Sequence, residues 1–365
     1  MAEIEQHTQI RAGRTGLTAS DPALACPGYV IYTPIAGDGT VYAIDVNGKE
    51  AHRWKLDYPP GLWGYVLPNG NFFYNGKIVG DDRWDRFESW KAFKGGIMLE
   101  VELDGTVVWE HRDPDHHHDG RRLEGGGALY MNLEPVTEEL AARVKGGIST
   151  AEPERMWADV IVEVDAAGKR VWEWHAAEHL DVERHVIGFN DHRSEWSHGN
   201  TVAPLPNDRV LVSFRNLSTV AIIDKASGRI EWELGPEVLA QQHDPSGLAD
   251  GNILVLDNGA HRLDNGLPFT RVVEIDPVSG DIVWSYQDSP PYAFFSAYIS
   301  GARRLSNGNT LITEGVPGRM FQVTPEGAVV WEYINPHFHL HVRGYQSNAV
   351  FRASLAPPGL ISGLP

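Results

Sequence analysis

Three histidines occupy comparable positions within a repeated pattern of this chain. His118 and His243 each stand five positions before a leucine, Leu123 and Leu248, that comes just ahead of a tight turn. His198, in WSHGNTVAPLP, begins the corresponding segment between them. Neutral imidazole acts as a nucleophile and as a general base near neutral pH. Three imidazoles gathered at one site would therefore suit group transfer or proton transfer.

Other residues near these histidines could contact a substrate. Arg215 ends the segment VLVSFRN, and its guanidinium offers a planar fork of donors to an oxyanion. Because a single histidine at a strand start more often fixes a loop, we interpret His116, His117, His179, His185 and His192 as structural. The remaining candidates for substrate contact precede predicted inner strands, and they are Trp63, His339, His341 and Tyr345. His117 is also kept as a candidate for substrate contact, as the alternative to its structural interpretation.

Bringing these residues together requires a repeat architecture, and the chain has six copies of one hairpin. Each copy is an apolar strand, a glycine turn and a second strand that ends in tryptophan. Self-similarity of this kind indicates a fold built from equivalent units. The copies are 41–54, 97–109, 160–172, 220–232, 272–284 and 320–331, and their tryptophans, predicted to be wedges between units, are Trp54, Trp109, Trp172, Trp232, Trp284 and Trp331.

A second hairpin recurs between these copies, at 64–76, 200–214, 246–259 and 302–315, with a weaker copy at 121–133. Its Asn-Gly and Asp-Gly pairs supply the positive φ angles that tight hairpin turns require. Each unit thus has four antiparallel strands, and such units around an axis form a β-propeller. The sequence therefore predicts an all-β fold, a six-bladed β-propeller of four-stranded antiparallel blades.

The two ends of the chain complete the sixth blade of this predicted ring. The last unit supplies one convincing strand, NAVFRASL at 348–355, and the chain begins with GYVIYTP at 28–34. We expect the N-terminal strands to pair with the C-terminal strand, because closure of the ring removes exposed sheet edges. The predicted organisation is an N-terminal extension at 1–27, a single propeller domain at 28–355 and a C-terminal tail at 356–365.

The long connections of the chain predict which face of the propeller carries the site. Segments 77–95, 134–157 and 175–196 are much longer than the hairpin turns, and 134–157 is partly helical by its Glu and Ala content. Long loops on one face of a rigid scaffold are where binding sites form. The inner strands begin at this face, so we expect His118, His198 and His243 to meet near the axis at its mouth. The aromatic residues of WDRFESWKAF, at 84–93, are expected to cap the core or line that mouth.

Composition limits the partners of the protein. The 365 residues carry 31 Lys and Arg against 49 Asp and Glu, so the formal net charge is −18, which argues against nucleic acid or an anionic membrane as the main partner. Cys26 is the single cysteine, which excludes an intrachain disulfide. The start, MAEIEQHTQIRAGRTG, lacks the apolar run of a secretory signal, and this predicts a soluble cytoplasmic protein. The expected partner is a small phenolic or anionic molecule.

The third and fourth units carry a family resemblance. WSHGNTVAPLPNDRVLVSFRNLSTVAIIDKASGRIEWELG, QHDPSGLADGNILVLDNG and RVVEIDPVSGDIVWSY resemble the arylsulfotransferase family of six-bladed propellers. The resemblance covers most of 28–355, although it is loose in the second blade. It implies a histidine nucleophile, matched by His243, together with His198, Asn200 and Arg215. The second-blade histidine of the family matches His118, with His117 as the alternative.

Three functions remain open at this point. The resemblance implies transfer of a sulfuryl group from an aryl sulfate to a phenol, with no cofactor. The alternative is a lyase or hydrolase that uses the same imidazoles as acid and base, or that binds a divalent metal through His118, His198 and His243. The predicted absence of a secretory signal and the single cysteine differ from exported relatives, and this favours keeping the alternative. A non-enzymatic interaction scaffold is the third, and clustered imidazoles at an axis are not typical of one.

Overall fold

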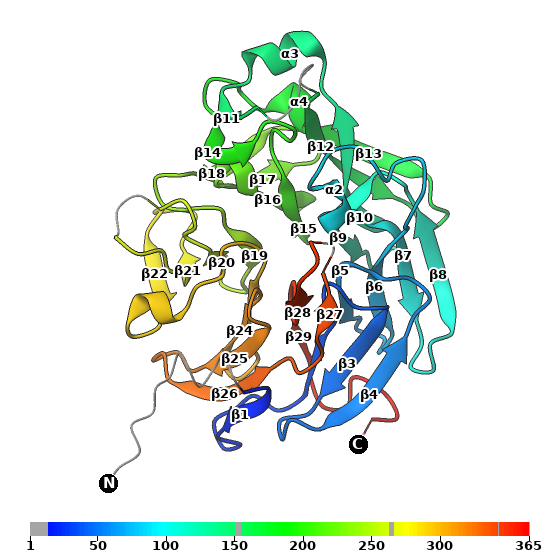
Figure 1. Ribbon diagram of the computed structural model, residues 1–365, viewed down its shortest axis with the longest axis vertical. Coiled ribbons are helices and arrows are strands. Elements are labelled where there is room, and N and C mark those ends of the chain that lie inside the picture. The colour runs from blue at the N-terminus through cyan, green and yellow to red at the C-terminus, as the bar shows by residue number, and fades with distance from the viewer. Residues whose placement is uncertain (1–13, 150–154, 263–265, 342, 365) are drawn as a thin grey trace.

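The protein folds as six sheets around a common centre, as Figure 1 shows for the computed structural model. The structure describes residues 14–149, 155–262, 266–341 and 343–364. The predicted six-bladed propeller of four-stranded antiparallel blades is confirmed. Residues 1–13, used to predict that no secretory signal is present, and 150–154 of the long connection lie outside the described ranges.

Five blades follow one another along the chain, each with its first strand innermost, and inner strands of neighbouring blades contact each other. Blade one contains β5 (Pro60–Val66), β6 (Phe72–Lys77), β7 (Gly96–Val101) and β8 (Val107–Arg112). Blade two contains β9 (His116–Arg122), β10 (Ala128–Pro135), β12 (Trp157–Val164) and β13 (Arg170–His175). Blade three contains β15 (Gly199–Leu205), β16 (Arg209–Phe214), β17 (Thr219–Asp224) and β18 (Ile230–Leu234). Blade four contains β19 (His243–Gly247), β20 (Ile253–Asp257), β21 (Arg271–Ile275) and β22 (Ile282–Tyr286), and blade five contains β23 (Gly301–Arg304), β24 (Thr310–Glu314), β25 (Arg319–Val323) and β26 (Val329–Ile334).

Blade six joins the two ends of the chain. Its inner strand, β29 (Ser354–Ala356), pairs with β2 (Tyr29–Tyr32), and β3 (Thr40–Ile44) and β4 (Glu50–Lys55) complete it. Closure by terminal strands is therefore confirmed, and the predicted strand 348–355 pairs both through β29 and through a single bridge from Val350 to Pro34. An unpredicted strand, β1 (Gly16–Ser20), adds to the outer edge of blade five opposite β26, within the predicted N-terminal extension.

Hydrophobic clusters fill the contacts between neighbouring blades. Met131 and Trp174 of blade two, for example, share one cluster with Val212 and Phe214 of blade three. The predicted tryptophan wedges are confirmed, because all six pack in or against clusters shared by neighbouring blades, and four of their indole N–H groups donate to a turn carbonyl of the next blade. These bonds run from Trp54 to Glu102 (3.1 Å), Trp172 to Lys225 (3.0 Å), Trp284 to Pro325 (2.7 Å) and Trp331 to Val46 (3.0 Å).

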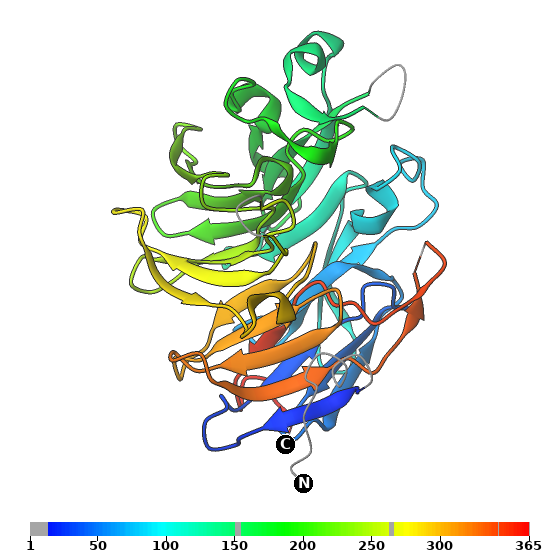
Figure 2. The same cartoon turned by 60° about the vertical axis from the view of Figure 1, so that its left-hand side comes forward.

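The long connections carry short helices and strands of their own. They include α2 (Trp90–Phe93), α3 (Glu138–Arg143), α4 (Ala176–His179), the 3₁₀ turns η1 (Arg215–Leu217) and η2 (Pro291–Ala293), and the hairpin of β27 (His339–Leu340) with β28 (Gln346–Ser347). An unpredicted parallel pair joins β11 (Gly146–Ile148) to β14 (Ile187–His192). In Figure 2 the cyan connection after β6 and the orange-red hairpin extend beyond the blades toward the same side. Among the described residues, no helix has the length and apolar character needed to cross a membrane.

Candidate active site

A cavity of about 310 Å³ lies at the loop-rich end of the axis, and each blade contributes one residue from the start of its inner strand. Blades two, three and four contribute imidazoles, whereas blades five, six and one contribute apolar side chains. The six residues, in ring order, are His118, His198, His243, Ile299, Phe351 and Leu62. The expectation that His118, His198 and His243 come together near the axis agrees with this geometry.

Strained backbone marks the positions where the inner strands enter the cavity. His118 and His198 have φ angles of 50° and 48°, and Leu62 and Ile299 have 117° and 55°. In blade four the strain falls one residue later, at Asp244, with φ of 56°. Non-glycine residues rarely adopt positive φ, at a cost of about 1–3 kcal/mol each, and such residues concentrate at functional sites. Irregular strand pairing next to several of these residues shows that the inner strands leave the regular sheet there.

The hydrogen bonds of His243 assign its tautomer. Its Nδ1 lies 2.7 Å from Asn258 Oδ1 and 3.2 Å from the Gln241 carbonyl oxygen. The Asn258 amide group donates to the Ser296 and Ile299 carbonyl oxygens, both at 2.8 Å, so its oxygen must face the ring. Nδ1 therefore carries the proton, and Nε2 keeps its lone pair on the cavity side.

His117 holds His118 in a similar way. The Nδ1 atoms of the two rings are 2.8 Å apart, and His117 Nε2 donates to the Asn132 carbonyl oxygen at 3.1 Å, close to Asp159 Oδ1. His117 Nδ1 then accepts from His118, which leaves His118 Nε2 without a proton. His117 is fully buried and is absent from the cavity wall. Of the two alternatives within HHHD, His118 is thus the residue at the cavity.

His118 and His243 are both neutral at pH 7. Burial lowers the pKa of His118 well below its ordinary value, and the neighbouring His198 and His117 lower it further. Burial also lowers the pKa of His243 well below its ordinary value, with the Arg215 charge as the next cause. Removing an imidazolium from water is unfavourable, so these rings remain available as nucleophile or base.

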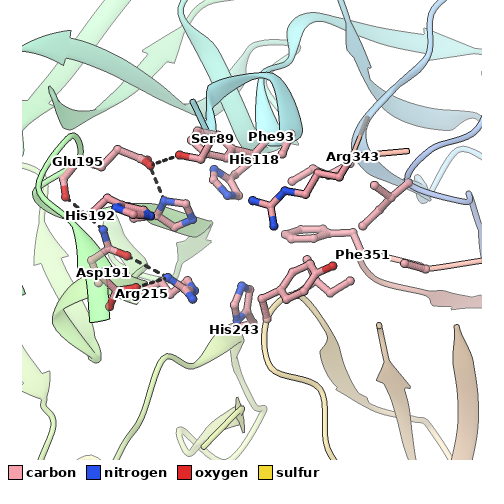
Figure 3. Close-up of a pocket in the computed structure, with 18 of the residues that line it drawn as sticks. Ser89, Phe93, His118, Asp191, His192, Glu195, Arg215, His243, Arg343 and Phe351 are labelled. Carbon is pink, nitrogen blue, oxygen red and sulfur yellow. Dashed lines mark hydrogen bonds and ion pairs between the residues drawn. The ribbon is translucent and has the colours of Figure 1, made fainter. Parts of the chain in front are cut away.

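His198 differs from these two because a carboxylate orients it. Its Nδ1 lies 2.7 Å from Glu195 Oε2, and Ser89 Oγ donates to Glu195 Oε1 at 3.1 Å (Figure 3). The ring packs 4.7 Å from that of His118 and 4.9 Å from that of Phe93, measured between centroids. A carboxylate that binds one ring nitrogen fixes the tautomer and directs the other nitrogen to the reacting groups.

Arg215 lines the cavity, but its charge is already compensated. Its Nη1 atom donates to Asp191 Oδ1 at 2.9 Å and to Asn216 Oδ1 at 3.0 Å, and Nη2 donates to Gln241 Oε1 at 3.1 Å. Two of its five N–H groups, Nε and one on Nη2, have no acceptor among the described residues. Arg215 can therefore contact an oxyanion through an edge of the guanidinium, without adding an unpaired positive charge.

Several other sequence candidates lie away from the cavity wall. Asn200 is fully buried and donates to the Gln242 carbonyl oxygen at 2.8 Å. Trp63 is buried and donates to Asp119 Oδ1 at 2.8 Å. His339 and Tyr345 belong to the hairpin segment beside the mouth but do not line the cavity, whereas His341 does.

Sequence reasoning also missed residues that line the cavity. His192, interpreted as structural, is part of the wall, as are Ser89, Asp191, Glu195, Tyr298 and Arg343. Phe93, from the aromatic segment 84–93, stacks on His118 at 4.4 Å, in agreement with the expectation that this segment lines the mouth. Most of the missed residues come from long connections that have no counterpart in the repeat. The dyad of Glu195 and His198 had one readable signal, a spacing of three residues.

The alternative metal site receives no support from the ligand geometry. In the part of the chain that the structure describes, no group of three or more His, Cys, Asp or Glu side chains is placed to hold a metal ion. The residues present therefore do not fit a three-histidine metal centre.

The fold defines a six-bladed propeller with a cavity on its axis that is lined by imidazoles on one side and apolar side chains on the other. Comparisons with known proteins agree with the fold. The chain belongs to the arylsulfotransferase family, whose model matches residues 40–239. A model described as outer membrane protein assembly factor BamB also matches residues 158–337.

Individual relatives are more distant. The dehydrogenase subunit of a quinone alcohol dehydrogenase, from Gluconacetobacter polyoxogenes and from Komagataeibacter europaeus, is 28% identical over 130 residues. The match covers 33% of this chain and only 17% of each relative. A solved structure of a Bacteroides caccae protein of unknown function has a TM-score of 0.53 and 13% identity, and covers 90% of this chain and 98% of that one. A streptogramin B lyase structure is also 13% identical, with 94% of each chain covered and a TM-score of 0.48.

Proposed function

We propose that this protein transfers a sulfuryl group from an aryl sulfate to a phenol, with His243 as the nucleophile. The observation that carries the proposal is the assignment of the His243 tautomer, which leaves Nε2 bare, neutral and on the cavity side. Membership of the arylsulfotransferase family supports the same reaction. Neutral imidazole is a competent nucleophile when a partner fixes its orientation.

The proposed reaction has two steps. His243 Nε2 attacks the sulfur atom of the aryl sulfate, an N–S bond forms, and the S–O bond to the ring breaks. His198 enters this step as the imidazolium, with Nδ1 donating to Glu195 Oε2, and the departing phenolate takes the proton of its Nε2. In the second step the incoming phenol gives its proton back to His198, its oxygen attacks sulfur, and the N–S bond breaks. Glu195 orients His198 throughout, and the two N–H groups of Arg215 that lack acceptors stabilise the sulfuryl oxygens.

A second candidate function is general-base catalysis by a lyase or hydrolase. The pair of Glu195 and His198 favours it, because a carboxylate-oriented imidazole is a typical base for activating water or removing a carbon-bound proton. In that case His243 forms no covalent bond, and an acceptor phenol has no effect on turnover.

The experiment that separates these functions measures release of 4-nitrophenolate from 4-nitrophenyl sulfate with and without added phenol. We expect release to depend on phenol, phenyl sulfate to form in equal amount, and double-reciprocal plots to be parallel. Release independent of phenol, with inorganic sulfate as the product, would support a hydrolase instead. No release under either condition would contradict sulfuryl transfer from this donor.

A further inference from the structure

Arg343 is the cation of the cavity that no sequence pattern indicated. It lies on the turn between β27 and β28 and lines the cavity. Figure 3 shows its guanidinium directed into the cavity above Phe351, on the side opposite Arg215 and Asp191. The two arginines thus approach the cavity from different halves of the ring.

The turn that carries Arg343 is held by a set of local bonds. His341 N donates to the Tyr345 carbonyl oxygen and Gly344 N to the His341 carbonyl oxygen, both at 2.8 Å. Arg343 N donates to His341 Nδ1 at 3.2 Å, and the His341 and Tyr345 rings stack with centroids 4.6 Å apart. The Tyr345 side chain also hydrogen-bonds to Tyr298, which lines the cavity. These contacts fix the position of the turn, and so they place the Arg343 guanidinium at the cavity.

The charge of Arg343 has no counterpart within reach. In the described ranges no carboxylate lies within ion-pair distance of its guanidinium, whereas Arg215 is paired with Asp191. Glu195, the other carboxylate of the wall, is bonded to His198 and Ser89. Arg343 is exposed at the mouth of the cavity, and an arginine fork there can bind a carboxylate through two parallel hydrogen bonds.

The apolar half of the ring lies beneath this arginine. Leu62, Ile299 and Phe351 come from the inner strands there, and Ile35 and Ala349 extend the same wall. An aromatic ring packed against this wall would hold its phenolic oxygen toward the imidazoles and its far edge toward Arg343. We propose that Arg343 binds a carboxylate on the acceptor ring, remote from the phenolic oxygen, so that the preferred acceptors are hydroxybenzoate-type phenols. The role of the phenolic oxygen as the sulfuryl acceptor rests on the proposed function. The contact between Arg343 and the carboxylate does not.

Direct binding tests this without relying on turnover. Calorimetry would compare 4-hydroxybenzoate with the neutral isostere 4-hydroxybenzamide on the wild-type protein and on Arg343→Gln. We expect the wild-type protein to bind the benzoate roughly 10-fold or more tightly than the amide, as charge-assisted hydrogen bonds of this kind contribute. Arg343→Gln should remove that preference and leave amide affinity unchanged, and Arg343→Lys should keep part of it. Arg53→Gln is the matched control, because it also removes one positive charge, at an exposed side chain of β4. This variant should behave as wild type.

Three results would overturn the proposal. They are equal wild-type affinity for the two ligands, an undiminished benzoate preference in Arg343→Gln, and an equal loss of affinity for both ligands in that variant. The same pair of compounds used as acceptors with 4-nitrophenyl sulfate then tests the reaction separately. A benzoate preference that depends on Arg343, without any sulfuryl transfer, would uphold the carboxylate site and refute the proposed function.

Discussion

The two halves of the cavity occupy equivalent positions of one repeat but differ in chemistry. Blades two to four present His118, His198 and His243, each held at Nδ1 by a buried polar partner. Blades five, six and one present Ile299, Phe351 and Leu62, which pack with Trp90 and Phe93 in one hydrophobic cluster. The six-bladed fold supplies six equivalent positions around the axis. The residue type at each position determines whether that side chain takes part in the reaction or binds the substrate ring. The reacting half and the ring-binding half are therefore separable by mutation.

The largest expected effect follows from removing the nucleophile of the reacting half. His243→Ala should lower kcat for 4-nitrophenyl sulfate by at least about 10³-fold, because covalent catalysis depends on this nitrogen. Affinity for 4-hydroxybenzoate should stay near the wild-type value, since the apolar half is untouched. His52→Ala, a half-buried histidine on β4, is the control. Near-wild-type kcat in His243→Ala would show that another residue is the nucleophile.

A smaller effect is expected from the carboxylate that orients His198. Glu195→Gln should lower kcat about 10- to 100-fold with little change in KM, as loss of a partner that orients a reacting residue does. Steady-state kinetics with Glu110→Gln, on the outer strand of blade one, provides the comparison. An equal fall in thermal stability and activity, with KM raised, would instead indicate a purely structural role for Glu195.

The buried neutral imidazoles also predict how stability changes with pH. Burial, with the neighbouring His117 as the next cause, lowers the pKa of His116 to about 3. Unfolded imidazole titrates near 6.5, so below that pH the unfolded chain binds a proton that the native protein does not, and the free energy of unfolding falls. Between pH 6.5 and 5 this one group contributes a loss of about 2 kcal/mol. The variant His116→Asn keeps an acceptor for Gly96 N. In urea unfolding, its free energy of unfolding should fall between pH 6.5 and 5 by that much less than the wild-type value does. An unchanged pH slope would contradict a neutral buried His116.

The smallest effect is expected on the ring-binding half. Phe351→Leu should raise KM for the aryl sulfate about 3- to 10-fold and leave kcat nearly unchanged, because an aromatic contact contributes about 0.5–1.5 kcal/mol beyond its area. Kinetics on wild type and variant side by side would measure this. A fall in kcat with KM unchanged would mean that Phe351 acts on the reacting half, and the division of the cavity would be wrong.

Repetition explains what the sequence could reveal. The hairpin turns fix the register of each inner strand, so a histidine five residues before a turn leucine lands at the same height in blades two and four. The tryptophan of each outer strand is recognisable for the same reason, although every outer strand continues one to three residues beyond it. Closure of blade six was predictable because the last unit lacks strands that the N-terminal segment supplies.

Features outside the repeat were not predictable in this way. Asn200 follows His198 by two residues, yet the pairing is irregular between Gly199 and Thr201, and its buried side chain bonds to Gln242 at the start of blade four instead of lining the cavity. Asn258 was overlooked although its amide fixes His243, since only three-dimensional contacts reveal such a partner. Arg343 sits on a hairpin with two-residue strands, too short to leave a periodic pattern.

The central claim, that His243 Nε2 takes the sulfuryl group, is tested most directly by mass spectrometry of the protein after brief incubation with 4-nitrophenyl sulfate without acceptor at neutral pH. We expect the intact mass to increase by one SO₃ group, the added group to map to the peptide containing His243, and added phenol to remove it. An unmodified protein that still releases 4-nitrophenolate at the full rate, or a sulfuryl group on a different residue, would contradict the account.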